Sequence, residues 1–342
     1  MKKLILLLFI PLVFTCSSDS SDDSSDDNNE QNNDPSICDT QAIYLDSNGV
    51  TIKACSWAEV GDTGVVDGVT YTVVDREMLD QMLLNEEDVT KVCTSRIVDM
   101  SHMFEDAEDF NQDIGNWDVS NVTDMSHMFE VAENFNQPIG DWDVSNVTDM
   151  SYMFYYNGVF NQPIGDWDVS NVTDMSYMFN YNDNFNHPID NWDVSSVTNM
   201  SGMFGNTYPF NQPIGDWDVS NVTDMSYMFS GAFNQPIGDW DVSNVTDMSY
   251  MFSEADFNQP IGDWDVSSVT NMRSMFSFSF FNQPIGDWDV SSVTNMYWMF
   301  AFAQAFNQDI SNWDVDNVLD CTGFSNNTPQ WTLPQPNFTN CN

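Results

Sequence analysis

The stretch that decides the fold reads Phe-Asn-Gln-Pro-Ile-Gly-Asp-Trp-Asp-Val-Ser-Asn-Val-Thr-Asp-Met-Ser-Tyr-Met-Phe and spans residues 135–154. Its Trp-Asp-Val core recurs every 23 to 25 residues, with the tryptophans at Trp117, Trp142, Trp167, Trp192, Trp217, Trp240, Trp264, Trp288 and Trp313. Self-similarity at a fixed period of this length is typical of a solenoid, in which each unit buries its apolar face against its neighbours. The sequence therefore predicts a repeat solenoid over residues 98–320.

Two apolar patterns predict the local structure of each unit. Residues 139–144 carry Ile, Trp and Val at the first, fourth and sixth positions, and the last two alternate as in a short strand. Residues 147–154 carry Val, Met and Phe at steps of three to four, which is the spacing of a helical or 3-10 turn with one buried face. Ser145 occupies an N-cap position before that turn. We therefore expect short parallel strands, about 4.8 Å apart between units, joined by such turns.

The repeat is very similar to that of the DUF285 family, and its unit resembles the leucine-rich-repeat relatives found in BspA-like surface proteins. The match rests on the motif F-N-Q-P-I-G-D-W-D-V-S-N-V-T-D-M-S-Y-M-F and covers about residues 98–324. The resemblance implies a bacterial surface protein with a leucine-rich-repeat-type solenoid, often linked to adhesion. It implies no catalytic residue.

The first residues predict export. Two lysines and the apolar run 4–14 are typical of a signal peptide, here residues 1–15. Residues 13–16 resemble a bacterial lipobox, which implies cleavage before Cys16, acylation of that cysteine and anchoring in outer-membrane lipid. An ordinary secretory signal that ends near a cysteine is the alternative.

Residues 16–36 contain almost only Ser, Asp, Asn, Glu and Gln, which predicts a disordered acidic tether. Its early acidic residues, Asp19, Asp22 and Asp23, look like the surface-export signals of Bacteroidetes lipoproteins. That resemblance implies exposure on the outer leaflet, whereas the alternative is a plain spacer.

The charge of the chain restricts its partners. The 342 residues include 53 acidic and only 7 basic side chains, for a net charge of −46. Such a chain repels phosphate backbones, which excludes nucleic-acid binding and leaves cations, neutral glycans and proteins with basic patches. A hydrophobic fraction of 42% excludes wholesale disorder.

The ends of the array need covering, because an open end would expose apolar side chains. Residues 37–97 predict a small α/β cap, with strands at 43–45, 50–52 and 69–74 and a helix at 75–85. Residues 321–342 contain three prolines and predict a C-terminal cap.

Apart from Cys16, all cysteines lie in these two end segments, which predicts disulfides in an exported protein. We expect the pairs Cys55–Cys93 and Cys321–Cys341, with Cys38 either free or replacing one N-terminal partner. The spacings disfavour a zinc site, and no metal is assigned.

A ladder of aspartates follows the tryptophans, and we expect it on the concave face, pointing away from the core. Its members are Asp118, Asp143, Asp168, Asp193, Asp218, Asp241, Asp265, Asp289 and Asp314. Neighbouring carboxylates at this spacing repel. Two arrangements could offset this repulsion. In one, backbone N–H groups of the following Ser-Asn-Val turn donate hydrogen bonds to each carboxylate. In the other, Ca²⁺ ions bind weakly at repeated positions along the ladder.

Aromatic residues offer the other candidate surface. One column comprises His102, His127, Tyr152, Tyr177, Gly202, Tyr227, Tyr250, Ser274 and Trp298. The segments between Met-Phe and Phe-Asn vary among units and contribute Tyr155, Tyr156, Tyr181 and Tyr208. Such rings stack on sugars or anchor protein partners, and variable loops on a rigid scaffold commonly carry recognition. Packing against the next unit and unconstrained loop drift are the alternatives.

These patterns predict a binding or adhesion module for an extracellular protein or glycan. The alternative is a structural or calcium-binding acidic spacer. We do not expect an enzyme, because a periodic array repeats one environment whereas an active site needs a distinct one.

Overall fold

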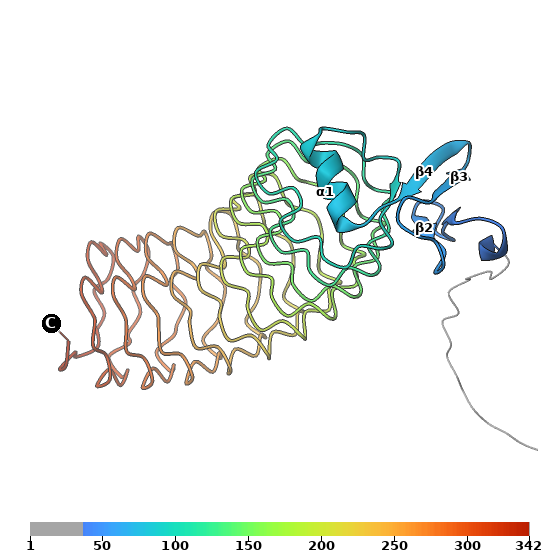
Figure 1. Ribbon diagram of the computed structural model, residues 1–342. Coiled ribbons are helices and arrows are strands. Elements are labelled where there is room, and N and C mark those ends of the chain that lie inside the picture. The colour runs from blue at the N-terminus through green and yellow to red at the C-terminus, as the bar shows by residue number, and fades with distance from the viewer. Residues whose placement is uncertain (1–36, 342) are drawn as a thin grey trace, which may run out of the picture. The chain divides into compact units, whose positions relative to one another are not determined.

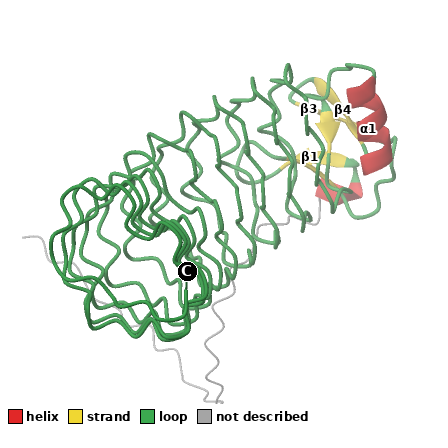
Figure 2. Cartoon of the chain, turned by 90° about the vertical axis from the view of Figure 1, so that its left-hand side faces the viewer, coloured by secondary structure: helices red, strands yellow, loops and turns green. Residues whose placement is uncertain are grey.

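The computed structural model describes residues 37–341, so the predicted signal peptide, the lipidation site Cys16 and the acidic tether lie outside the described residues. Within that range, no helix combines the length and the apolar character needed to cross a membrane. Nearly all regular secondary structure lies at the N-terminal end, and the rest of the described chain consists of turns (Figure 2).

The N-terminal cap is a small α/β assembly. Its elements are η1 (Ile37–Asp39), β1 (Ile43–Leu45), β2 (Ile52–Ala54), β3 (Thr63–Val66), β4 (Val69–Val73), α1 (Arg76–Leu84) and β5 (Val92–Cys93). Strands β1 and β2 pair antiparallel, while β4 lies between antiparallel β3 and parallel β5. Strands β3 and β5 were not expected from the sequence.

Local sequence explains the best-defined of these elements. Asp75 is the N-cap of α1, and its carboxylate accepts a hydrogen bond of 2.9 Å from the Met78 N–H. Asp67 and Gly68 join β3 to β4 with φ of 51° and 81°, as a two-residue hairpin turn requires. The Ile52 N–H donates to the Asn116 carbonyl at 2.9 Å, so the cap is hydrogen-bonded to the first repeat.

After β5 the chain winds into successive coils, each of which carries one repeat unit (Figure 1). From residue 150 to residue 156, every second backbone N–H donates to a carbonyl of the next coil, at N···O distances of 2.8 to 3.0 Å. Of the intervening N–H groups, those of Met153 and Tyr155 donate to the carbonyl three residues earlier, at 3.3 and 3.0 Å, and that of Ser151 donates to the Asp149 carboxylate at 2.9 Å. Both sets of donors are thereby satisfied without a continuous strand or helix.

This pattern corrects the expected local structure. The predicted strand at 139–144 is wrong, since the parallel bridges between coils fall at Asp149 and its equivalents. The segment predicted as a helical turn supplies the pairing instead. Tyr152 and Tyr156 have φ of 57° and 55°, so the backbone alternates between right- and left-handed turns. The apolar steps of three to four therefore reflect consecutive tight turns.

Columns of identical side chains fill the interior of the stack. The repeated Trp, Ile, Val, Met and Phe residues are buried in one continuous cluster. Each indole also donates across coils; for example, Trp142 Nε1 lies 3.2 Å from the Ile114 carbonyl. Ring centroids of Phe154 and Phe179 are 5.6 Å apart. Every coil therefore shields its neighbour's apolar face, which accounts for the near-invariance of these positions along the chain.

The C-terminal segment covers the last coil. Trp331 packs edge-on against Phe300 with ring centroids 5.3 Å apart, and its indole donates to the Gln308 carbonyl at 3.1 Å. A disulfide joins Cys321 to Cys341. The aromatic rings of this segment thus take the place of the next coil.

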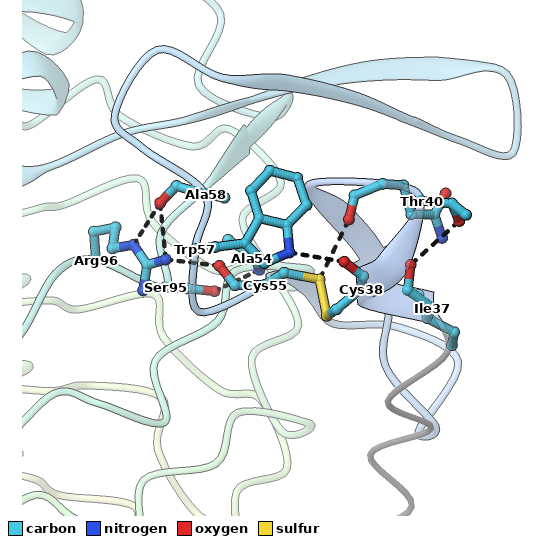
Figure 3. Close-up of a disulfide and its surroundings, with 10 residues drawn as sticks. Ile37, Cys38, Thr40, Ala54, Cys55, Trp57, Ala58, Ser95 and Arg96 are labelled. Atoms are coloured by element: carbon cyan, nitrogen blue, oxygen red, sulfur yellow. Dashed lines mark hydrogen bonds between the residues drawn. A yellow bond between two sulfur atoms is a disulfide. The ribbon is translucent and has the colours of Figure 1, made fainter.

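The N-terminal disulfide differs from the one expected. Cys38 pairs with Cys55 (Figure 3), whereas Cys93 is free and buried. The predicted Cys55–Cys93 pair is therefore wrong. The Cys93 thiol lies 3.2 Å from the Ile52 carbonyl, inside the cap. The Trp57 indole and the Arg96 guanidinium bind carbonyls of Cys38 and Cys55, at 2.7 Å each.

Candidate functional site

The aspartate ladder is held by local hydrogen bonds. Asp143 Oδ1 accepts the backbone N–H of Ser145 at 3.2 Å and its hydroxyl at 2.6 Å, and most other ladder positions repeat this arrangement. The Ser243 hydroxyl, and then its N–H, lower the pKa of Asp241. The ladder residues from Asp143 onward are exposed, while Asp118 is buried beside the Ser95 hydroxyl. These bonds supply the local stabilisation considered above, and Ca²⁺ binding stays a prediction.

A second column of Asp and Asn was not noticed in the sequence. Its carboxylates repeat the same turn; for example, Asp149 Oδ1 accepts the Ser151 N–H at 2.9 Å. Two asparagines of the column bind the preceding carboxylate with their amides: Asn199 Nδ2 lies 3.0 Å from Asp174 Oδ2, and Asn271 Nδ2 lies 2.9 Å from Asp247 Oδ2. Occasional asparagines therefore interrupt the like-charge column.

The aromatic column forms a row of stacked rings. His102, His127, Tyr152 and Tyr177 follow one another with centroid separations of 4.4, 4.7 and 4.8 Å. The non-glycine members of the column have positive φ, between 53° and 58°, which side chains seldom adopt. Tyr177 lies over Gly202, where an added Cβ would come within 2.5 Å of the ring. Packing and exposure coexist here, because the rings stack on those of adjacent coils and yet none of these four is fully buried.

Tyrosines of the variable loops extend this row into a cluster. Tyr156 stacks on Tyr181 with centroids 4.3 Å apart, and Tyr155 contacts Tyr152 and Tyr177 at 5.3 and 6.4 Å. Tyr156 and Tyr181 are about two-fifths exposed. The structure thus gathers these five predicted residues into one surface, the tyrosine cluster. Tyr208, half exposed, lies over Gly231.

Further along the stack, the aromatic row borders a hollow of about 360 Å³. The short segment Ser230–Ala232 replaces the five-residue loops of earlier units, which leaves room at this point. The lining includes Gly205, Asn206, Tyr227, Ser230, Tyr250, Glu254, Arg273, Phe278, Tyr297 and Trp298. We call this site the arginine hollow.

Arg273 organises the arginine hollow. Its Nε donates to the Tyr250 hydroxyl at 2.9 Å, and its guanidinium carbon lies 4.6 Å from the centroid of the Tyr297 ring, a cation–π geometry. Tyr227 stacks on Tyr250 at 4.3 Å. Burial, and next the neighbouring Tyr250, raise the pKa of Tyr227 to about 12. The Tyr227 phenol thus stays a neutral hydrogen-bonding group in the lining that holds Arg273.

One buried polar atom in this lining lacks a partner. The Ser230 hydroxyl is almost fully buried, and it forms no hydrogen bond among the described residues. An unpaired buried hydroxyl costs free energy that a ligand or water could recover. Ser230 is also one of the residues that line the arginine hollow.

Sequence reasoning placed Tyr227, Tyr250 and Trp298 on this surface but missed Arg273 and Tyr297. A signal was present: Arg273 is the only Lys or Arg after residue 96. It stands where most units carry a serine. A single cation among so many acidic residues is a candidate functional group.

A larger hollow, of about 570 Å³, lies between α1 and the first coil. Its lining combines apolar residues with the acidic residues Glu86, Glu87, Asp106, Glu108 and Asp109. Among the lining residues there is no basic side chain to orient an anionic or polar ligand. We therefore base the function on the arginine hollow and the tyrosine cluster.

The comparisons identify the repeats. A family model described as "Mycoplasma protein of unknown function, DUF285" matches residues 75–181, 157–256 and 230–332. These ranges overlap and together run from α1 into the C-terminal segment. No curated protein and no solved structure matches the chain significantly.

Proposed function

Since the chain belongs to the DUF285 family, whose description names no function, we propose that its repeats form a binding module for an extracellular glycan or protein. The observation that carries this proposal is the arginine hollow, in which stacked tyrosines, one cation and an unpartnered hydroxyl line the same depression. The tyrosine cluster extends the aromatic surface along the stack.

A sugar fits the chemistry of the arginine hollow best. Ring faces and edges such as those of Tyr227 and Trp298 pack on the apolar faces of sugars. Arg273 supplies donors for a carboxylate or for hydroxyl groups. A net charge of −46 favours ligands that are neutral or carry only a local negative group.

The proposal places the module on a bacterial cell surface, as the resemblance to BspA-like proteins implies. The lipobox-like residues 13–16 and the acidic residues after Cys16 support an outer-membrane lipoprotein. We propose further that the stacked coils form a repeat solenoid, supported by the hydrogen bonds and ring columns between consecutive units. Radiolabelled palmitate incorporation that is lost in Cys16→Ser would support the anchor, and unchanged labelling would remove it.

A glycan and host-protein array, probed with the full chain, tests the binding function. Arg273→Ser and Tyr250→Ser install residues that other units carry at the same positions (Ser249 and Ser274), so the fold should persist. We expect each to weaken binding at least tenfold, because each removes a ring or cation of the hollow.

Asn244→Ser is the matched control, since other units carry Ser at that position and it does not line the hollow. It should bind as the unmodified chain does. If no glycan or protein binds, or if the two hollow variants bind undiminished, the proposal fails.

The alternative role is an acidic, calcium-binding envelope spacer. One observation favours it: both Ser145 bonds to Asp143 fall on Oδ1, which leaves Oδ2 for a hard cation. Calorimetry with Ca²⁺ separates the two roles. Saturable heat with a rise in melting temperature would support the spacer, and the absence of both would remove it.

A further inference from the structure

Two histidines that are 25 positions apart in the sequence meet on adjacent coils. The rings of His102 and His127 stack with centroids 4.4 Å apart and planes inclined by 9°. Each histidine also pairs with a glutamate three residues later. His102 Nδ1 lies 2.8 Å from a Glu105 carboxylate oxygen, and His127 Nδ1 hydrogen-bonds to Glu130 in the same way.

The ligand atoms are close enough to share one ion. One donor atom each from His102, Glu105 and His127 lie within 4.8 Å of one another. Two ligands on a tetrahedral zinc ion are about 3.3 Å apart when the metal bonds are 2.0–2.1 Å. The side chains of His102 and Glu105 are about half exposed. They can therefore rotate and bring the donor atoms to the separation that the metal requires.

We propose that His102, His127 and Glu105 bind one divalent transition-metal ion, with Glu130 as a carboxylate that orients His127. Imidazole with carboxylate is a donor set that Zn²⁺, Ni²⁺ and Cu²⁺ accept well. The hydrogen bond between the His127 imidazole and the Glu130 carboxylate is the kind of contact that positions histidine ligands in metal sites. The positive charge of the ion offsets the repulsion of the acidic side chains around it.

The position of the cluster in the array is unusual. Later members of the same column are Tyr152 and Tyr177, which stack as well as histidine does but offer no imidazole. Stacking alone therefore explains an aromatic ring at this column, and it does not explain two histidines with a glutamate three residues after each. The first two coils thus carry a donor set that the Tyr152 and Tyr177 coils lack.

Electron paramagnetic resonance with Cu²⁺ tests the site on the full chain without a polyhistidine tag. Millimolar Mg²⁺ is added to occupy carboxylate-only positions, which prefer hard cations. We expect one Cu²⁺ per chain with hyperfine splitting from two imidazole nitrogens. His102→Tyr and His127→Tyr should each reduce this to one nitrogen and weaken binding at least tenfold, and the double variant should show none.

Two further variants guard against a folding artefact. His187→Gln is the matched control, because the same position carries glutamine in other units. The His187 ring forms a hydrogen bond with the Asn161 carbonyl, away from the proposed ligands. This variant should bind Cu²⁺ as the unmodified chain does. Glu105→Gln keeps the ring stack and should weaken binding by removing a charged ligand. The proposal is overturned if the unmodified chain shows no nitrogen splitting, or if both tyrosine variants retain it.

Discussion

At the residue scale, the aspartate ladder shows how a repeat tolerates many like charges. Each carboxylate accepts the N–H of the residue two positions later, which is a serine everywhere except after Asp314. In most units the serine hydroxyl donates as well, as Ser243 does to Asp241, where the two bonds measure 3.1 and 2.6 Å. These bonds stabilise the ionised form and lower the pKa of Asp241. The hydrogen bonds of each turn therefore stabilise the negative charge of the aspartate that begins it.

Ser243→Ala should lower the free energy of unfolding by roughly 0.5–1 kcal/mol at pH 7, since it removes a hydrogen bond to a solvent-screened carboxylate. The folded pKa of Asp241 lies below its ordinary value, so the folded chain binds this proton less tightly than the unfolded chain. The difference in stability between the unmodified chain and Ser243→Ala should persist at any pH above the ordinary pKa of aspartate. It should disappear as the pH falls through the pKa of Asp241 in the folded chain.

Urea unfolding of both chains across this pH range measures the effect. Ser230→Ala is the control, because the Ser230 hydroxyl has no partner among the described residues and its loss should not destabilise. A difference for Ser243→Ala that is independent of pH would contradict the capping role.

The buried indoles pack in the core and also form hydrogen bonds between adjacent coils. Trp217 Nε1 donates to the Ile189 carbonyl at 3.2 Å, inside the core. Trp217→Phe should lower the free energy of unfolding by about 1–2 kcal/mol, from the lost hydrogen bond and the lost volume. Trp57→Phe in the cap is the control, since the indole that it replaces is half exposed and its hydrogen bond to the Cys38 carbonyl is open to water, so its loss should cost less. Thermal melts of the two variants measure these losses of stability. Equal losses would contradict a stabilising hydrogen bond between the coils.

At the scale of elements, the repeat unit shows which local structures its sequence predicted. The apolar pattern indicated the buried face correctly, because Trp, Val, Met and Phe are all buried. It did not indicate the hydrogen bonding, and the expected strand at 139–144 is replaced by turns. Left-handed residues such as Tyr152 explain the failure: tight packing against the adjacent coil holds them at a φ that tyrosine seldom adopts.

The N-terminal cap supplies a covalent prediction. Cys38 and Cys55 are 17 residues apart, and a disulfide that closes a loop of this length stabilises by about 3 kcal/mol in the chain-entropy view. Cys93 lies in β5, and burial raises the pKa of its thiol, which lowers its reactivity. We therefore expect an alkylating reagent to leave Cys93 unmodified until the chain unfolds.

Peptide mass mapping of the oxidised protein checks this arrangement. A peptide that links Cys38 to Cys55, together with Cys93 labelled only in urea, is the expected outcome. The Cys321–Cys341 pair serves as the internal control, because its joining peptide should appear in the same digest. Recovery of a Cys55–Cys93 peptide, or labelling of Cys93 in the native protein, would contradict the structure.

For the whole molecule, repetition itself determines how stability should respond to length. Each coil is hydrogen-bonded to the coils next to it. The free energy of unfolding should therefore be close to a sum of one contribution per coil and one per interface between coils. Removing one period, residues 169–193, joins equivalent positions and keeps every column in register. We expect this variant to unfold cooperatively at a somewhat lower temperature than the full chain.

Removing residues 169–180, about half a period, is the matched control. It joins positions that are not equivalent, so the tryptophan and phenylalanine columns lose their register and cooperative unfolding should be lost. Differential scanning calorimetry distinguishes the two deletions. Equal behaviour of both would contradict a stack in which each coil depends on the register of its neighbours.

The sequence by itself determined the period and the buried residues of the repeats, because nine similar copies must bury the same apolar positions in the same way. Only the tertiary structure decided which side chains meet across coils. The pairing of His102 with His127, the place of Arg273 between Tyr250 and Tyr297, and the choice of Cys38 as partner for Cys55 depend on distances between backbones. A one-dimensional pattern carries no such distances, since inter-coil hydrogen bonds and turn geometry set them.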